Sequence, residues 1–252
     1  MKAYIVTGSS SGVGAATALA LAREGSAVAI NYSKSAAAAE EAAQACIKAG
    51  GDALAVRADV SSDADCKALA AAALSKWGRL DGLVNNAGTT KFASMRDLDA
   101  LNAEDFQRIY AVNVIAAYQM VRACLPALRE ARGAVVNVSS ISSTQGIGSS
   151  MAYAASKGAL NSLTIAMAKN LGPEIRVNAV LPGFIETNWL KTGLGAAYEK
   201  ARDNYRANSV LGATLLPEDV ADCIVALLKA AKITGQLQII DGGRGLGAGP
   251  GL

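Results

Sequence analysis

The sequence predicts a doubly wound α/β fold, in which a parallel sheet of about seven strands carries helices on both faces. Short apolar runs rich in valine and isoleucine alternate with long alanine-rich stretches along the chain. These runs show little alternation between inward and outward residues, which is typical of strands buried on both faces of a parallel sheet. Strand–helix alternation of this kind favours the doubly wound architecture. No linker or repeat interrupts it, so we predict one domain over residues 1–252.

Each predicted strand is one of the apolar runs, and each predicted helix is one of the alanine-rich stretches between them. The strands are predicted at 3–7, 27–31, 53–57, 80–85, 134–139, 175–181 and 236–240. The helices are predicted at 12–24, 36–49, 62–77, 103–131, 151–171 and 217–231. Glycine follows four helices, where a helix stop is expected. Pro217 suits the first turn of the last helix.

Composition argues against several other classes of protein. Hydrophobic residues make up 52% of the chain and charged residues 18%, which is unlike a disordered protein and allows a sizeable core. The formal charge is +3 without a basic run, so nothing supports a nucleic-acid partner. The chain has no histidine and only scattered cysteines, so we expect no metal site and free thiols in a reducing compartment.

Targeting signals are not evident either. The amino-terminal run Met1–Thr7 is too short for a signal peptide. No apolar stretch approaches the roughly 20 residues of a bilayer span. We therefore expect a cytoplasmic protein without a membrane partner.

An eight-residue segment, TGSSSGVG, lies between the first predicted strand and the first predicted helix at Thr7–Gly14. Its first glycine can take a turn conformation closed to other residues, its second lets backbone approach a pyrophosphate, and its third lets helix and strand pack closely. Tight turns also need glycine, but this position favours a dinucleotide site with phosphates at the helix N-terminus. The predicted cofactor contacts are Gly8, Ser10, Ser11, Gly12, Val13 and Gly14.

The second predicted strand ends in AINYSKS, without the acidic residue that many dinucleotide sites place there to bind the adenine ribose. No carboxylate in this turn would repel a 2′-phosphate, and Lys34 with the neighbouring serine hydroxyls can bind one. We therefore predict cofactor contacts at Tyr32, Ser33 and Lys34, and NADPH as the preferred cofactor. NADH is the alternative, and Lys34 would then be a solvated surface residue.

Two further turns after predicted strands carry candidate cofactor contacts. Asp59 and Val60 follow the third strand, and the Asp59 carboxylate can accept a hydrogen bond from the adenine amino group. Asp59 is also explained as a helix cap or turn residue. After the fourth strand, Ala87 and Gly88 are small enough for the backbone to lie against a ribose, and Asn86 can join neighbouring strands.

Tyr153 and Lys157 lie four residues apart in AYAASKGAL, on one face of a predicted helix. A nearby ammonium favours the phenolate, so we expect Lys157 to lower the pKa of Tyr153 from about 10 toward neutrality. The pair would then perform acid–base chemistry without a histidine. The alternative is a surface tyrosine beside a solvated lysine.

Taken together, these residues resemble the classical short-chain dehydrogenase/reductase family over essentially the whole chain. The matching pieces in order are Thr7–Gly14, Asp59, Asn85–Gly88, Asn113, Ser140, Tyr153 with Lys157, and Pro182-Gly183 followed by Thr187. The NYSKS turn, SKGAL and the ending GQLQIIDGG make the chain most similar to the 3-oxoacyl-[acyl-carrier-protein] reductases. One departure is Ser11, where many NADPH-dependent members carry a basic residue.

The resemblance implies a catalytic set. Ser140 would hydrogen-bond the substrate oxygen, Tyr153 would give a proton to the carbonyl as hydride arrives, and Lys157 would also hold the nicotinamide ribose. Asn113 would hold a water in a proton relay to Lys157, although a core asparagine bonded to backbone is compatible with the same position. The predicted cofactor contacts after the sixth strand are Pro182, Gly183, Ile185 and Thr187.

Two long segments, 89–102 and 183–212, leave strands at the edge of the sheet where ligands are expected, and they are candidate walls of a substrate site. The second is interpreted as a lid with an apolar inner surface formed by Phe184, Trp189, Leu190, Leu194, Tyr198 and Tyr205. A helical pair packed for stability or assembly is the alternative. The family resemblance further implies a homotetramer built through helices 103–131 and 151–171.

The function expected from these features is NADPH-dependent reduction of a carbonyl to a secondary alcohol, with a 3-oxoacyl thioester as one candidate substrate. One alternative is an NAD(P)-dependent dehydrogenase of a sugar, polyol or other secondary alcohol. Another is a dinucleotide-binding regulator without catalysis. An acyl-carrier-protein substrate would require a basic patch, for which the candidates are Lys91, Arg96, Arg129 and Arg132.

Overall fold

The computed structural model describes residues 1–247 and contains one seven-stranded sheet. The last five residues of the glycine-rich tail lie outside the described residues. The strands are β1 (Ala3–Val6), β2 (Ala27–Tyr32), β3 (Asp52–Arg57), β4 (Gly82–Asn85), β5 (Ala134–Val138), β6 (Arg176–Pro182) and β7 (Leu237–Ile240). All neighbouring pairs are parallel, in the order β3-β2-β1-β4-β5-β6-β7. The predicted fold class is therefore confirmed.

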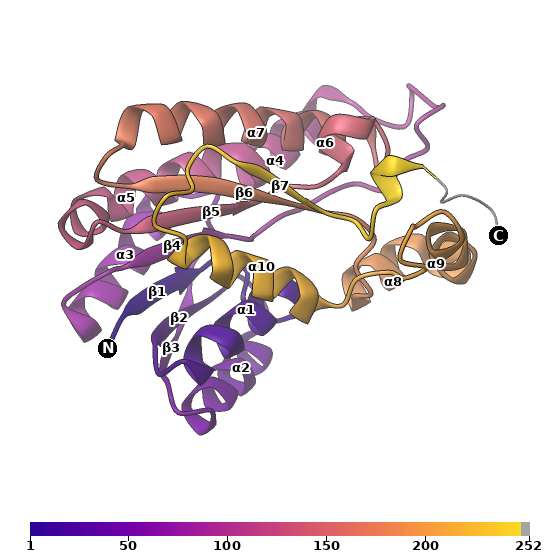
Figure 1. The fold of residues 1–252 in the computed structure, drawn as a ribbon. Coiled ribbons are helices and arrows are strands. Elements are labelled where there is room, and N and C mark those ends of the chain that lie inside the picture. The colour runs from indigo at the N-terminus through magenta and orange to yellow at the C-terminus, as the bar shows by residue number, and fades with distance from the viewer. Residues whose placement is uncertain (248–252) are drawn as a thin grey trace.

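Helices cover both faces of this sheet (Figure 1). One face carries α1 (Gly12–Arg23), α2 (Ala36–Lys48) and α10 (Pro217–Lys229). The other carries α3 (Asp63–Trp77), α4 (Ala103–Tyr110), α5 (Ala116–Ala131) and α7 (Met151–Leu171). Three short helices lie near the carboxyl ends of the strands, at the right of Figure 1: α6 (Ser142–Gln145), α8 (Asn188–Leu194) and α9 (Tyr198–Ala207).

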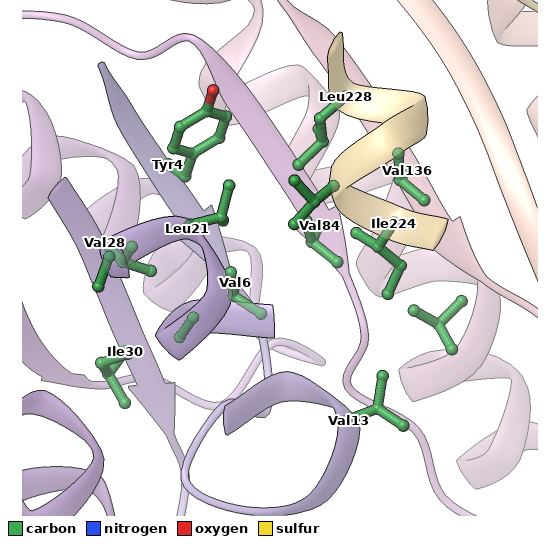
Figure 2. Packing of buried hydrophobic residues seen from close by; sticks show 14 of the residues in the cluster. Tyr4, Val6, Val13, Leu21, Val28, Ile30, Val84, Val136, Ile224 and Leu228 are labelled. Atoms are coloured by element: carbon green, nitrogen blue, oxygen red, sulfur yellow. The ribbon is translucent and has the colours of Figure 1, made fainter. Parts of the chain in front are cut away.

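Two large hydrophobic cores form because successive strand residues point to opposite faces, and a third, small cluster contains Ile141, Ala179, Leu181 and Tyr205. Val6 joins the core under α1 and α10, which Figure 2 shows, while Ile5 joins the core under α3 and α5. Val84 and Leu83 divide between the two cores in the same way. Both faces of the central strands are buried, so these strands are mostly apolar, as the sequence pattern indicated, with buried asparagines at Asn31, Asn85, Asn137 and Asn178. The edge strand β7 exposes Gln238 and Ile239.

The site expected from this topology is the gap where the strand order reverses. The chain winds outward from β1 through β2 to β3 in one direction, and through β4 to β7 in the other. The turns that leave β1 and β4 therefore diverge to opposite faces, which opens a crevice at their carboxyl ends. The glycine segment after β1 and the NNAG segment after β4 both lie at this crevice.

The predicted helix 103–131 is interrupted by a π-helical segment at Ala111–Ile115, between α4 and α5. The expectation that no apolar stretch approaches a bilayer span is wrong for this helix. Its length of 29 residues and the mean hydropathy of 1.3 over an 18-residue window within it suffice by those two measures alone. Its buried side chains, including Met120 and Leu128, pack in a core against the sheet. The long apolar helix of a globular fold accounts for the same composition.

Candidate active site

The glycine segment after β1 leaves no room for a side chain where it meets the turn after β4. A Cβ on Gly14 would lie 2.5 Å from Asn86 Nδ2, 2.6 Å from the Gly8 carbonyl oxygen and 2.8 Å from Ser9 Cα. Gly8 itself has a φ of 61°, a conformation that L-residues with side chains rarely adopt. Only glycine at these positions lets α1 begin directly against the end of the strand.

The N-terminus of α1 has the features of an anion site. Ser11 is its N-cap residue, yet the Ser11 side chain makes no capping hydrogen bond, and the first turn carries no acidic residue. The first backbone N–H groups of a helix have no partner within the helix. The predicted contacts Ser10, Ser11, Gly12 and Val13 all belong to this turn, so the residues present fit the pyrophosphate of a dinucleotide.

Asn31, at the end of β2, is buried and serves the scaffold. Its Oδ1 accepts a hydrogen bond from Gly8 N at 3.0 Å, and its Nδ2 donates to the Ala58 carbonyl at 3.0 Å. The amide therefore joins the glycine turn to the ends of two other strands. Both of its polar atoms are used within the protein, which leaves the recognition of the adenosine ribose to the residues that follow.

An open cavity lies beside those residues, lined by Ser33, Lys34, Arg57, Asp59 and Asp65. Arg57 was missed in the sequence analysis. It is the last residue of β3 and pairs in register with Tyr32 of β2, which brings its side chain next to Lys34. If β2 and β3 are aligned from their first paired residues, Ala27 and Asp52, the same count of residues leads to Tyr32 and Arg57. This alignment would have identified Arg57 as a neighbour of the β2 turn.

The Asp59 side chain stabilises the turn that follows β3. Its Oδ1 accepts hydrogen bonds from the Ser61 N–H at 3.0 Å and the Ser61 hydroxyl at 2.7 Å. These bonds, with a smaller contribution from nearby Lys34, hold the pKa of Asp59 below its usual value. The carboxylate is exposed, whereas Val60 is buried. The helix cap is Ser62, so of the two local explanations for Asp59 the turn applies.

The turn after β4 is joined to β1 by a closed set of hydrogen bonds. Asn86 Nδ2 donates to the Thr7 and Gly8 carbonyls at 2.9 and 3.0 Å. The Thr7 hydroxyl accepts from the backbone N–H groups of Asn86 and Ala87, each at 3.0 Å. Asn86 thus joins the two strands, as predicted. The bonds set the width of the crevice in which a nicotinamide ribose would lie.

Gly88 lies between Asn113 and Lys157. A Cβ built on Gly88 would be 3.6 Å from Asn113 Oδ1 and 3.7 Å from Lys157 Nζ. Asn113 belongs to the π-helical segment, accepts from Thr89 N at 2.8 Å and donates to the Thr89 carbonyl at 3.0 Å and Ser156 Oγ at 3.0 Å. A π-helical insertion rotates the side chains that follow it and is frequent at functional sites. Here it accompanies a buried asparagine whose side chain reaches the segment after β4.

Lys157 and Tyr153 lie on the same face of α7, with Lys157 Nζ 5.6 Å from the centre of the Tyr153 ring. Lys157 is buried and donates to the Val138 carbonyl at 2.7 Å. Burial lowers the pKa of Lys157 to about 8. The fold of residues 141–152 also returns the chain so that Ser140 lies close enough to Tyr153 to influence its pKa. Ser140 Oγ itself donates to Ser142 Oγ at 2.9 Å and accepts from Ser142 N at 3.1 Å.

The expected lowering of the Tyr153 pKa is not what the structure shows. Burial raises the pKa of Tyr153 to about 12, and hydrogen bonding with Ser140 opposes this only in part. Desolvation penalises the charged phenolate, and here it is the dominant cause of the shift. Tyr153 is therefore a neutral phenol at pH 7, which is the protonation state of a proton donor.

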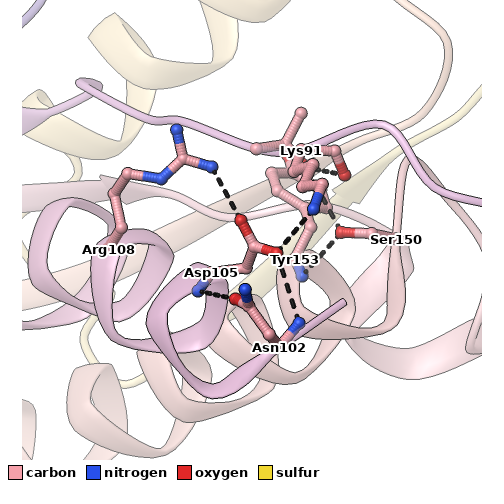
Figure 3. Close-up of polar contacts among 7 residues, drawn as sticks. Lys91, Asn102, Asp105, Arg108, Ser150 and Tyr153 are labelled. Atoms are coloured by element: carbon pink, nitrogen blue, oxygen red, sulfur yellow. Dashed lines mark hydrogen bonds and ion pairs between the residues drawn. The ribbon is translucent and has the colours of Figure 1, made fainter. Parts of the chain in front are cut away.

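The start of α7 is joined to the segment after β4 near Tyr153. Ser150 Oγ caps α7 by accepting from Tyr153 N at 3.3 Å, and Thr90 Oγ1 lies 2.8 Å from Ser149 Oγ. Lys91 Nζ donates to Asp105 Oδ2 at 2.7 Å, as Figure 3 shows together with the Ser150 cap. The serine before an apolar helix was the available signal for this cap.

The four basic candidates do not form one patch. The charge of Lys91 is paired with Asp105, which also pairs with Arg108. Arg129 and Arg132 lie where α5 ends and leads into β5, at the amino edge of the sheet and away from Tyr153. Sequence spacing could not separate the two edges, because it does not show which end of a helix lies near a site.

The segment after β6 supplies the remaining predicted contacts. Gly183 N donates to the Ile240 carbonyl at 2.8 Å, and Ile185 pairs with Leu215 in an isolated parallel bridge. Thr187 caps α8, with its Oγ1 accepting from Leu190 N at 3.3 Å. Thr187 Cγ2 lies 3.7 Å from where a Cβ on Gly12 would be. The start of the segment after β6 therefore meets the glycine turn across the crevice.

Comparison with known proteins decides the family. The family model described as enoyl-(acyl carrier protein) reductase matches residues 8–244. A protein of Streptomyces violaceoruber, named as a ketoacyl reductase of the granaticin polyketide synthase, is 42% identical over 95% of this chain and 94% of its own length. An L-rhamnose 1-dehydrogenase (NAD(P)(+)) from a Sphingomonas species is 36% identical over 96% of this chain and 95% of its own length.

Two solved structures are similar to this chain over nearly its whole length. A protein of Burkholderia xenovorans described as a short-chain dehydrogenase/reductase has a TM-score of 0.91 and 38% identity, covering 98% of this chain and 99% of its own. A 7α-hydroxysteroid dehydrogenase complexed with NADH and 7-oxo glycochenodeoxycholic acid has a TM-score of 0.87 and 29% identity, covering 96% and 93%.

The chain belongs to the short-chain dehydrogenase/reductase family.

As a short-chain dehydrogenase/reductase, the protein is an NAD(P)-dependent oxidoreductase acting on carbonyl or alcohol groups. The structure brings Asn113, Ser140, Tyr153 and Lys157 together at the carboxyl ends of β4 and β5, next to the glycine turn. The residues missed by sequence reasoning are those whose importance depends on strand register or on helix capping, namely Arg57, Thr90 and Ser150.

Proposed function

We propose that the protein is an NADPH-dependent carbonyl reductase in which Tyr153 is the proton donor. The observation that carries this proposal is the neutral Tyr153 phenol, with a pKa of about 12, beside Ser140 and Lys157 at the edge of the dinucleotide crevice. Bound NADPH supplies the hydride that adds to the carbonyl carbon. Tyr153 gives its hydroxyl proton to the carbonyl oxygen, which takes the electron pair of the broken C=O π bond.

The other residues of the set hold the reacting groups. Ser140 Oγ, which donates to Ser142 Oγ at 2.9 Å and accepts from Ser142 N at 3.1 Å, would turn its hydroxyl proton to a carbonyl oxygen that also contacts the Tyr153 hydroxyl. Lys157 is protonated at neutral pH, because its pKa of about 8 lies above pH 7, and it can return a proton to the tyrosinate. Asn113 positions Thr89 and Ser156 around Lys157 through its hydrogen bonds. The product of the reaction is a secondary alcohol.

A direct test is the initial rate of NADPH oxidation with an acetoacetyl thioester, run in parallel with NADH. We expect turnover with NADPH and a kcat/KM at least about ten times lower with NADH. A rate with NADH alone would contradict the cofactor assignment. No rate with any of a panel of ketones and thioesters, despite tight cofactor binding, would instead favour the regulator without catalysis.

NADPH is favoured by two cations beside the adenosine ribose position. Lys34 and Arg57 line the cavity after β2 and β3, and among residues 1–247 neither takes part in a salt bridge. The Ser33 side chain lies in the same cavity. A 2′-phosphate there would meet two cations, with Asp59 and Asp65 also lining the cavity. Arg57 compensates for Ser11, the position at which many relatives carry a basic residue.

Replacing Lys34 or Arg57 by alanine should weaken binding of 2′,5′-ADP about tenfold, since a hydrogen bond to a charged group contributes about 1.5–3 kcal/mol, in part offset by solvent screening. Binding of 5′-AMP, which lacks the 2′-phosphate, should change less than about twofold. Calorimetric titration of both nucleotides measures the difference. Lys48→Ala is the matched control, because Lys48 ends α2 at the far edge of the sheet. Equal loss for both nucleotides would contradict the assignment.

The leading alternative is a dehydrogenase of a sugar or other polyol, which the rhamnose dehydrogenase among the relatives keeps open. A polyol site needs many hydrogen-bonding groups. The residues packed near Tyr153 from the segment after β4 and from α8 are instead the aromatic Phe92 and Trp189. We therefore place carbonyl reduction first. Comparing rates of alcohol oxidation with NADP⁺ and NAD⁺ over sugars, polyols and simple secondary alcohols separates the two.

Assembly and location are also proposals. Ile115, Tyr118 and Ile165 are exposed on the helices that the family resemblance assigns to a tetramer interface, and a second copy would cover them. Cys46, Cys66, Cys124 and Cys223 are all free thiols, as expected in a reducing cytoplasm.

A further inference from the structure

Three aromatic rings from distant parts of the chain meet at the candidate proton donor. The Trp189 ring of α8 lies 5.6 Å from the Phe92 ring and 6.3 Å from the Tyr153 ring, measured between ring centres. Both pairs are tilted, at 54° and 45°. Phe92 comes from the segment after β4, and Tyr153 from α7. We call these three residues the ring cluster.

α8 makes its contact with the opposite wall of the site through this cluster. The helix has no buried residue of its own. Its Gly193 lies directly over Phe92, where a Cβ would come within 2.0 Å of Phe92 Cε2 and Cζ. A glycine at this position lets the helix lie flat on the Phe92 ring. The contact between the tilted Trp189 and Phe92 rings is largely apolar and offers few hydrogen-bonding groups.

Both ends of α8 are held in place, so the contact belongs to a defined position of the lid. At its start, Ile185 pairs with Leu215, and Thr187 caps the helix. Beyond its end, Tyr198 and Tyr205 of α9 are buried and pack on Phe184, with ring centres 5.6 and 5.7 Å away. Between these anchored ends, α8 contacts Phe92 through Trp189 and Gly193.

We infer that the ring cluster is a substrate subsite for the flat, apolar ring of a cyclic ketone, whose carbonyl then lies at Tyr153. A planar ring entering beside Trp189 would replace the contact between Trp189 and Phe92 with two similar contacts. Aromatic pairs are stabilised beyond simple burial of area, and a rigid ring loses less conformational freedom on binding than an extended acyl chain. The inference rests on the proposed carbonyl reductase and names its substrate class.

The test compares 2-tetralone, a bicyclic ketone with one aromatic ring, with the acetoacetyl thioester of N-acetylcysteamine. We expect Trp189→Ala to lower kcat/KM for 2-tetralone about 30-fold, mainly through KM, because an aromatic contact and its buried area are lost. The loss of kcat/KM for the thioester should be at least about fivefold smaller than the loss for 2-tetralone. Trp189→Phe, which keeps a ring, should retain activity on 2-tetralone within about threefold. Equal losses on both substrates with Trp189→Ala would overturn the inference while leaving the reductase intact.

A binding measurement separates this inference from the proposed function. The chain has two tryptophans, so Trp77→Phe leaves Trp189 as the only indole reporter. Titration of that variant with 2-tetralone in the presence of NADP⁺ should quench Trp189 fluorescence to saturation, and the thioester should not. Saturable quenching without turnover would support the subsite and contradict the reductase. Turnover of the thioester without any saturable quenching by 2-tetralone would do the reverse.

Discussion

Replacement of Tyr153 by phenylalanine is expected to lower kcat for carbonyl reduction by about 10³-fold, within the range that a positioned general acid contributes. The change removes one oxygen and retains the ring that contacts Trp189 and faces Lys157. The hydroxyl is the proton source because burial keeps it neutral, with a pKa of about 12. Without it, the carbonyl oxygen would have to take its proton from water.

Rates of carbonyl reduction measure the effect on kcat, and fluorescence titration with NADPH measures the effect on cofactor binding. The Kd for NADPH should change less than about threefold, since the ring and Lys157 are unchanged. Tyr118→Phe is the matched control, because Tyr118 is exposed on α5 and should keep full activity. If Tyr153→Phe retained more than about one tenth of the wild-type kcat, another group would be the acid.

Replacement of Gly14 by alanine should be the most destabilising of the single-residue changes considered. The new Cβ would lie 2.5 to 2.8 Å from Asn86 Nδ2, the Gly8 carbonyl and Ser9 Cα, two of which are backbone atoms that cannot rotate away. Overpacking of this kind costs about 1–3 kcal/mol, and we place Gly14→Ala at the upper end, about 3 kcal/mol. For a chain of this size that corresponds to a fall in Tm of about 6–12 °C.

The test compares the Tm of Gly14→Ala with the Tm of the control variant Gly158→Ala, both measured by thermal melting. Gly158 lies within α7, and its added Cβ would meet only Ser143 O, at an ordinary 3.8 Å. Alanine there should leave the Tm unchanged or raise it, because glycine inside a helix is about 1 kcal/mol less favourable than alanine. NADPH binding by Gly14→Ala should also weaken, since Asn86 and Gly8 border the crevice. A Gly14→Ala variant as stable as the wild type would show that the turn can relax.

The sequence alone determined the order and type of the elements and the identity of the main site residues. Buried parallel strands are apolar along their length and helices end at glycine, and both signals are local, so all seven strands and the six long helices fell where the pattern placed them. The glycine turn, the NNAG turn and the Tyr153–Lys157 spacing are local as well. Their order along the chain sufficed to indicate the family.

Tertiary structure decided what depends on register, burial and contact between distant segments. Arg57 joins Lys34 only through the register of β3 with β2. The Tyr153 pKa rises because the site is desolvated, which exceeds the opposing effect of the Ser140 hydrogen bond. Lys91 is paired with Asp105, which lies 14 residues further along the sequence. Trp189 contacts Phe92, from which it is separated by 97 residues. Local periodicity carries no information about such distances, because they are set by how the packed elements meet in space.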